Sequence, residues 1–167
     1  ISAADANAIN GFTTGKVTTT ATSISGSAAD VKTLLVANTA GGGQLAGFSA
    51  LPITITDSGV ISAAVIKDIV NDGATGLVTI SSNATGITGN YTDVAAVRGF
   101  DTAGTPSLVG TDSLNLILTE AIVPAQQAAL ATNSVKITAT ITTEAGKSVA
   151  LFTGDVGNAQ NLTNLVG

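Results

Sequence analysis

The sequence predicts an α/β tandem repeat, an elongated array of helix–strand–helix–strand units of about 60 residues each. Three observations carry this prediction. The chain matches itself at a nearly constant spacing, Ala-rich segments alternate with segments of β-branched residues, and the apolar side chains are mostly small. Small apolar residues are suited to many thin layers between stacked units, as in repeat proteins.

The internal match divides the chain into repeat 1 at 1–59, repeat 2 at 60–121 and a partial repeat 3 at 122–167. Ile1-Ser2-Ala3-Ala4 returns as Ile61-Ser62-Ala63-Ala64. From Asp30 onward the register is constant and has no gap, which pairs Asp30 with Asp93, Leu45 with Leu108, Gly47 with Gly110 and Ile53 with Leu116. Such a period is typical of modular arrays, which usually act as scaffolds or binding surfaces.

Each repeat is expected to contain two helices. The first lies at 2–10, with equivalents at 62–72 and 124–130, and the second lies at 27–35, with an equivalent at 91–98. Ser2 is a suitable N-cap with Asp5 three residues on, and Asn10-Gly11 is a suitable end. Pro124 stands where a proline is tolerated in a first turn.

The strands are expected at 17–22, 53–56, 77–81, 114–119 and 135–142, where β-branched residues gather. Alternation of strands with helices favours α/β units with adjoining parallel strands. A mainly β array with short helical connectors is the alternative, because the strands are Thr-rich and the segment 135–142 alternates cleanly over its length.

Hydrophobic residues make up 44% of the chain, with 4 Phe, 1 Tyr and neither Trp nor Met, so the core must be built from aliphatic side chains. The periodicity predicts ten core residues: Val17, Val31, Leu34, Ile53, Ile55, Val78, Val94, Leu114, Leu116 and Leu118. The shortage of aromatic rings argues against a sugar or nucleobase site built on ring faces.

Charge and composition exclude several classes of function. The net charge is −5, with only 6 Lys and Arg and no basic cluster, so neither nucleic acid nor anionic lipid is an expected partner. Without His or Cys the chain cannot form a Ser-His-Asp triad or a usual zinc site, and we expect that it is not an enzyme. The chain contains no run of 18 apolar residues, so the sequence predicts no membrane span.

Because the sequence starts at Ile1 and lacks Met, it is expected to be a processed product or a piece of a longer chain.

Calcium is the ligand that the sequence favours, and no other cofactor is expected. Asp57, Asp101 and Asp112 stand in turns rich in Gly, Ser and Thr, and such turns supply the oxygen ligands that hard cations prefer. The alternative is that these aspartates only stabilise turns and helix ends through local hydrogen bonds. No EF-hand pattern accompanies them.

The strings Ile1-Ser2-Ala3-Ala4-Asp5, Gly15-Lys16-Val17-Thr18 and Ile24-Ser25-Gly26-Ser27 resemble a repeat of very large secreted bacterial surface proteins, cyanobacterial ones especially. The segment Ile53-Thr54-Ile55-Thr56-Asp57 looks like the end of that unit. The resemblance implies an extracellular, cell-surface location and a structural role as a surface-layer or adhesin-like module, with no catalytic residues. Calcium-binding repeats often accompany such modules, but their glycine–aspartate nonapeptide is absent from this chain.

Together these features predict a non-enzymatic, extracellular structural protein, a self-assembling subunit or a segment of a bacterial surface layer, fibre or adhesin stalk. Its expected partners are other copies of itself or neighbouring repeats. The alternative is a glycan- or protein-binding module of a secreted protein, with a cell-surface glycan or a protein held at the loops 38–50 and 99–113.

Overall fold

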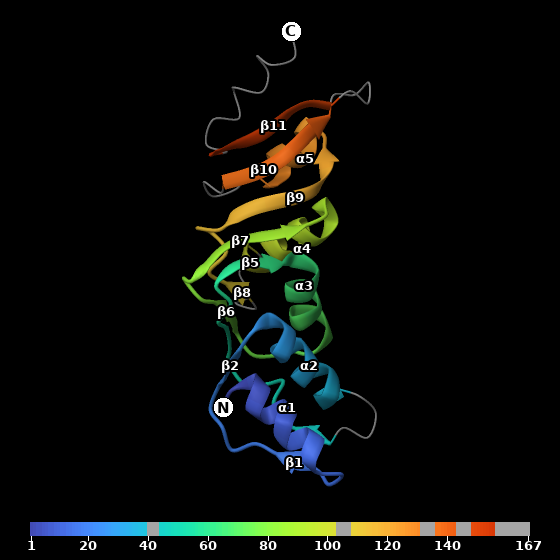
Figure 1. Cartoon of the computed structure of the whole chain (residues 1–167), viewed down its shortest axis with the longest axis vertical. Coiled ribbons are helices and arrows are strands. Elements are labelled where there is room, and N and C mark those ends of the chain that lie inside the picture. The colour runs from blue at the N-terminus through green and yellow to red at the C-terminus, as the bar shows by residue number, and fades with distance from the viewer. Residues whose placement is uncertain (40–43, 103–107, 131–135, 143–147, 156–167) are drawn as a thin grey trace.

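A computed structural model of the chain describes residues 1–39, 44–102, 108–130, 136–142 and 148–155. The fold is mixed α/β with mainly parallel sheets, which confirms the predicted class (Figure 1). The helices are α1 (Ala3–Phe12), α2 (Ala28–Thr39), α3 (Ala63–Asp72), α4 (Tyr91–Thr102) and α5 (Pro124–Leu130). The strands are β1 (Val17–Thr18), β2 (Ile24–Gly26), β3 (Leu45–Ala46), β4 (Ile53–Ile55), β5 (Gly59–Ser62), β6 (Val78–Ile80), β7 (Ala84–Gly89), β8 (Leu108–Val109), β9 (Asn115–Ile122), β10 (Lys136–Thr142) and β11 (Ser148–Asp155).

The helices begin where the sequence places capping residues. The Ser2 hydroxyl accepts a hydrogen bond from the Asp5 N–H at 3.0 Å, as predicted, and α5 begins at Pro124. The predicted end of α1 at Asn10 was wrong, because the helix continues to Phe12. A glycine within a helix costs only about 1 kcal/mol relative to alanine, so Gly11 does not by itself end it.

The helices stack in chain order. α1 packs against α2, α2 against α3, α3 against α4, and α4 against α5, so the helices follow one another along the long axis of Figure 1. The strands lie beside this row of helices (Figure 1). The chain therefore returns to a helix after each strand segment, and consecutive helices become neighbours.

The strands form three sheets. One holds β2-β4-β6-β8, a second holds β5-β7-β9-β10-β11, and a third holds β1-β3. All of these pairs are parallel except β10 with β11. Parallel strands need a crossover between them, and the helices provide it here.

Each of the two larger sheets carries a continuous line of buried aliphatic residues at matched register positions. The first line joins the strands of the four-stranded sheet and consists of Ile24, Ile53, Val78 and Leu108. The second line consists of Ile61, Ile87, Leu116 and Ile137. We call these the first and second ladders. They belong to one buried cluster that crosses both predicted repeat boundaries, after residues 59 and 121.

Nine of the ten predicted core residues are buried, and the tenth, Val17, is partly buried against the core. The predicted strand at 17–22 was too long, because regular pairing ends at Thr18. The Thr19 hydroxyl accepts a hydrogen bond from the Ala21 N–H at 2.9 Å. Such a local side-chain bond gives the backbone an alternative to the sheet, which explains the early end.

The sheets do not follow the sequence repeat from one end to the other. Ile53 and Leu116 are sequence equivalents, yet Ile53 lies in the four-stranded sheet and Leu116 in the five-stranded one. The change occurs at β5, which lies between β4 and α3 and begins the five-stranded sheet. The five-stranded sheet therefore starts at the boundary between repeats 1 and 2, while the four-stranded sheet continues across it through β6 and β8.

Candidate functional site

Asp57, one of the three predicted calcium ligands, binds a helix end. Its Oδ2 accepts a hydrogen bond from the Ala28 N–H at 2.7 Å, at the first residue of α2. Glu120, its sequence equivalent in repeat 2, accepts a hydrogen bond from the Tyr91 N–H at 2.8 Å, at the first residue of α4. The two repeats therefore use one device, in which a carboxylate 29 residues beyond the first helical residue satisfies a free helix N–H and the positive helix end.

The same two helix ends also carry local caps. The Ser27 hydroxyl accepts from the Asp30 N–H at 3.1 Å, and Asn90 Oδ1 accepts from the Asp93 N–H at 2.8 Å. In return, Ser27 and Asn90 donate to the carboxylates of Asp30 and Asp93 at 2.7 and 3.0 Å. These reciprocal bonds resemble capping boxes, and they recur at equivalent positions of the two repeats.

Asp112 has a different role. Its Oδ1 lies 3.1 Å from Nη1 of Arg98, and the same Nη1 donates to the buried Thr111 hydroxyl at 2.9 Å. The Arg98 side chain is 4% exposed, whereas that of Asp112 is 65% exposed. The carboxylate is therefore a surface partner that balances a buried guanidinium.

Asp57 and Asp112 thus have separate partners. Asp101 lies in the last turn of α4, and its side chain falls outside the described part of the chain. Among the residues that the structure describes, no three Asp, Glu, His or Cys side chains gather to hold a metal ion. Calcium binding stays a prediction from the sequence, and Asp57 caps a helix end through a long-range hydrogen bond and not a local one.

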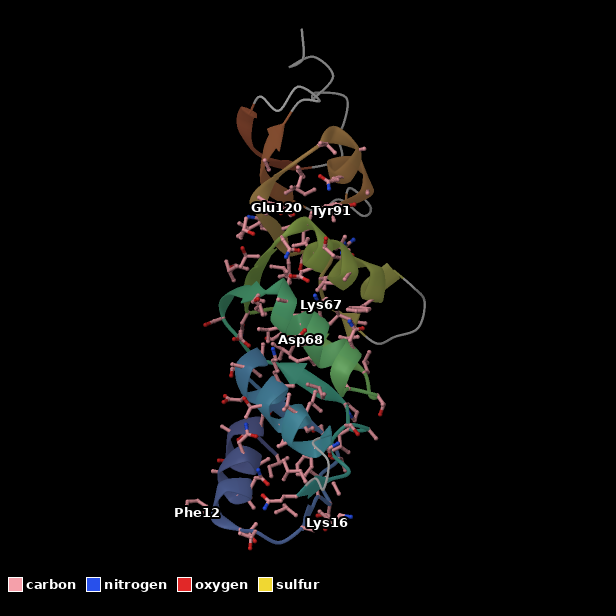
Figure 2. All side chains as sticks on the ribbon, turned by 90° about the vertical axis from the view of Figure 1, so that its right-hand side faces the viewer. Phe12, Lys16, Lys67, Asp68, Tyr91 and Glu120 are labelled. Carbon is pink, nitrogen blue, oxygen red and sulfur yellow. The ribbon has the colours of Figure 1, made fainter. Side chains whose placement is uncertain are left out.

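Ion pairs join neighbouring helices. Lys32 on α2 pairs with Asp68 on α3, and Lys67 on α3 pairs with Asp93 on α4. Lys67 and Asp68 are adjacent, so α3 sends one charge toward each neighbouring helix (Figure 2). Asn7 continues this series, since its Nδ2 donates to the Asp30 carbonyl at 2.9 Å and joins α1 to α2.

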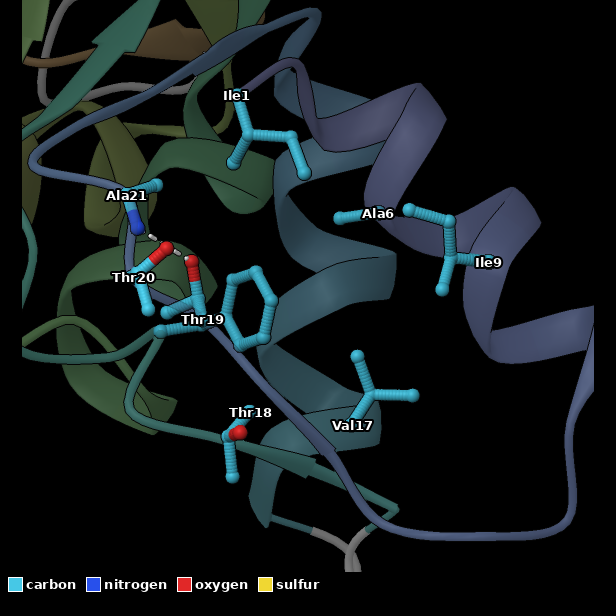
Figure 3. A pocket seen from close by; sticks show the side chains of 9 residues that line it. Ile1, Ala6, Ile9, Val17, Thr18, Thr19, Thr20 and Ala21 are labelled. Atoms are coloured by element: carbon cyan, nitrogen blue, oxygen red, sulfur yellow. Dashed lines mark hydrogen bonds between the residues drawn. The ribbon is translucent and has the colours of Figure 1, made fainter.

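An open hollow of about 300 Å³ lies between α1 and the segment 17–21. Figure 3 shows Ile1, Ala6 and Ile9 on one side of it and Val17 and Thr19 on the other. Phe48, which is buried, also lines it. Phe12 is 91% exposed and projects from the end of α1 (Figure 2).

This end of the molecule is the candidate functional site, and the sequence did not single it out. Ile1, Ile9 and Phe12 are large exposed apolar residues of one short segment, and Ile1 and Ile9 line the hollow. The sequence held one signal, because Ile1 and Ile9 match Ile61 and Ile69 of repeat 2. Their different exposure is visible only in the structure.

The predicted binding loops at 38–50 and 99–113 are described in part. Their segments 40–43 and 103–107 fall outside the described residues, and the rest includes β3 and β8.

No family model matches the chain, and neither a curated protein nor a solved structure matches it. Within the described residues, no helix combines the length and the apolar character that crossing a membrane requires.

Proposed function

We propose that the chain is a non-enzymatic structural repeat protein, an elongated tandem array that acts as a self-assembling subunit or a segment of a bacterial surface layer, fibre or adhesin stalk. Its place would be outside the cell, at the cell surface. The observation that carries this proposal is the pair of aliphatic ladders, which place one buried side chain per strand along four successive strands of each large sheet.

A ladder of this kind supports a linear architecture. Each unit buries its apolar face against its two neighbours in the chain, so that stability is a sum of unit and interface terms along one direction. The helix row follows the same rule, since each helix packs against the next. The Lys32–Asp68 pair adds a polar contact between repeats 1 and 2, and the Lys67–Asp93 pair joins the two helices of repeat 2.

The placement of the charged residues supports a structural role as well. Asp57 and Glu120 cap helices, while Asp68, Asp93 and Asp112 pair with Lys or Arg side chains. These carboxylates hold elements in place, which is what an array that keeps a fixed shape requires of its polar groups. Neighbouring repeats or other copies of the chain are the partners that such an array would contact.

The binding-module alternative has one observation in its favour, the hollow beside α1. Its lining is aliphatic and hydroxyl-bearing, with Phe48 as its aromatic member. A glycan site relies on exposed ring faces and convergent polar groups. Since Phe48 is buried, the hollow suits an apolar protein surface better than a sugar.

Small-angle X-ray scattering tests the proposed shape. A compact protein of 167 residues has a radius of gyration of about 15 Å, and the expected value for any measured mass follows from the same scaling. We expect a radius clearly above the compact value for the mass found in solution, with a skewed distance distribution. A compact radius would contradict the array.

Electron microscopy tests assembly. The purified chain would be imaged with millimolar calcium and, separately, with a chelator. Filaments, sheets or rods would support the structural role, and their loss in chelator alone would place a metal at the contacts. Compact separate particles in both samples would favour the binding module.

A further inference from the structure

We propose that Lys67 and Asn90 join in a covalent amide bond within the folded chain, with Asp93 as the catalytic base. The three side chains meet where α3 lies against the start of α4. The Asp93 carboxylate binds the Lys67 amine through Oδ1 and the Asn90 carboxamide nitrogen through Oδ2, the latter at 3.0 Å. One carboxylate therefore holds an amine nucleophile and a carboxamide electrophile, and it can move protons between them.

The carboxamide of Asn90 is prepared for attack. Its Oδ1 accepts a hydrogen bond from the Asp93 backbone N–H at 2.8 Å, in the first turn of α4. Addition of an amine to the carboxamide carbon places negative charge on this oxygen. The N–H and the positive end of the helix stabilise that charge, as the donors of an oxyanion hole do.

The packing of α3 directs Lys67 toward Asn90. Ala63 lies one helical turn before Lys67 on the same face of α3, and helical side chains lean toward the N-terminus of their helix. A Cβ on Gly89, the residue before Asn90, would lie 3.0 Å from the Ala63 Cβ. The lysine stem therefore leans toward the turn of α3 that contacts the segment in which Asn90 stands.

Buried residues border the reacting groups. The side chain of Asp93 is 12% exposed and that of Lys67 is 30% exposed, while Ala63 and Val94 are fully buried. Charge interactions are stronger in such a setting than in water. Reacting groups held together in one molecule can reach effective concentrations of about 10⁵ M or more. Because the bond forms only once in each chain, even a slow reaction is sufficient.

Repeat 1 contains the same backbone frame. A Cβ on Gly26 would lie 2.9 Å from the Ala3 Cβ, which repeats the contact between Gly89 and Ala63. The equivalent helix start also has the reciprocal capping bonds described above. The close approach of the two segments is therefore a property of both repeats.

Repeat 1 lacks the reacting groups within this frame. Asn7 stands at the lysine position and Ser27 at the asparagine position. Serine and asparagine cap helices about equally well, so capping does not require Asn90. Asn7 joins its helix to the next through the Asp30 carbonyl, so a polar contact between the helices does not require a lysine. The two changes in repeat 2 together supply the amine and the carboxamide.

The reaction balances without a cofactor or an oxidant. Asp93 accepts a proton from the Lys67 ammonium, and the neutral Nζ forms a bond to Cγ of Asn90. Asp93 then gives its proton to Nδ2, the Cγ–Nδ2 bond breaks, and ammonia leaves. The second amine proton passes through Asp93 to the ammonia, so the products are one amide and one ammonium ion. The amide keeps the oxygen that caps α4.

Mass spectrometry of the purified, denatured full chain tests the proposal. We expect a chain that is lighter than its sequence mass by one ammonia. Trypsin cleaves after unmodified lysine, so it should fail to cut after Lys67 and should leave 33–98 as one peptide that carries the mass loss. A chain with the full sequence mass would overturn the proposal.

Four variants identify the reacting groups. Lys67→Arg keeps the positive charge and Asn90→Ser keeps a helix cap, and each should restore the full sequence mass. Asp93→Asn removes the base and leaves both reacting groups, and it should restore the full mass as well. Lys32→Arg is the matched control, because Lys32 pairs with Asp68 and should retain the mass loss. Loss of ammonia in Asp93→Asn as complete as in the unaltered chain would contradict the role of Asp93.

An asparagine can also lose ammonia by closing a ring on its own backbone. That loss would leave tryptic cleavage after Lys67 intact and would persist in Lys67→Arg, and this result would overturn the amide bond. The amide bond and the proposed structural role fail separately. The mass decides the first, whereas the radius of gyration tests the second.

Discussion

Asp57 Oδ2 lies 2.7 Å from the backbone nitrogen of Ala28, so the carboxylate that ends one strand segment caps the helix that began 29 residues earlier. Glu120 and Tyr91 repeat this bond at 2.8 Å. The cap joins distant parts of the chain, in contrast to the capping boxes that accompany it. Each of the two caps lies within one repeat and ties a later segment of that repeat to the start of its second helix, and it is open to direct test.

Removing the long-range cap should destabilise the fold. Asp57→Ala takes away an acceptor of a helix N–H, and we expect a loss of about 0.5 to 2 kcal/mol in the free energy of unfolding. Asp57→Asn keeps an acceptor oxygen and should lose less. Urea denaturation followed by circular dichroism measures both. An Asp57→Ala midpoint equal to that of the unaltered chain would show that the bond contributes nothing.

The Arg98–Asp112 and Lys32–Asp68 ion pairs differ in burial, so removing the carboxylate from each should reduce the free energy of unfolding by different amounts. Asp112→Ala removes a partner of the buried Arg98 guanidinium, and we expect a loss of about 1 to 3 kcal/mol. Asp68→Ala breaks the partly exposed pair with Lys32, and we expect about 0 to 1 kcal/mol. Chemical denaturation of both variants checks the order. The reverse order would contradict the assigned roles.

Gly47 and Gly110 form a matched pair for backbone strain. They are sequence equivalents with φ of 85° and 93°, a region that side chains disfavour. A Cβ on Gly47 would lie 3.7 Å from the Thr19 methyl, whereas one on Gly110 would lie 2.5 Å from the Ile80 carbonyl oxygen. Gly47→Ala should cost about 1 to 2 kcal/mol. Gly110→Ala should cost about 1 to 3 kcal/mol more, because the backbone must move. Thermal unfolding of both variants measures these losses of stability. Equal losses for Gly47→Ala and Gly110→Ala would show that the close approach of the Ile80 carbonyl oxygen has no effect.

The ladders should carry much of the stability. Leu116→Ala empties a fully buried position of the second ladder, and Ile53→Ala does the same in the first, so each should cost about 2 to 5 kcal/mol. Val60→Ala on β5 is the control, since Val60 is half exposed and should change stability by less than about 0.5 kcal/mol. Urea midpoints that hardly move for Leu116→Ala would contradict the core assignment.

Calcium should leave Asp57 and Asp112 with their present partners. Binding at ten times the dissociation constant would stabilise the protein by about 1.4 kcal/mol, which a melting curve detects. We expect the difference in Tm between calcium and chelator to be the same for the unaltered chain and for variants at these two residues. A calcium-induced rise in Tm that Asp57→Asn abolishes would support the metal site predicted from the sequence.

The sequence by itself determined the features that depend on a few neighbouring residues. The helix start at Ser2, the α/β class and the core positions Val31, Leu34 and Leu116 follow from caps and periodicity, which act within one or two turns. The constant register of the internal match also paired Asp30 with Asp93, and both carboxylates accept a hydrogen bond from the residue that caps their helix.

Only the tertiary structure decided which distant segments meet. The pairing of Ile53 with Val78, the cap from Asp57 to Ala28 and the exposure of Ile9 each depend on contacts between segments far apart in the sequence. Ile9 and Ile69 show the reason most clearly. Burial is a property of what lies against a side chain. The same residue in the same repeat position is therefore buried on α3, which packs against both α2 and α4, and partly exposed on α1.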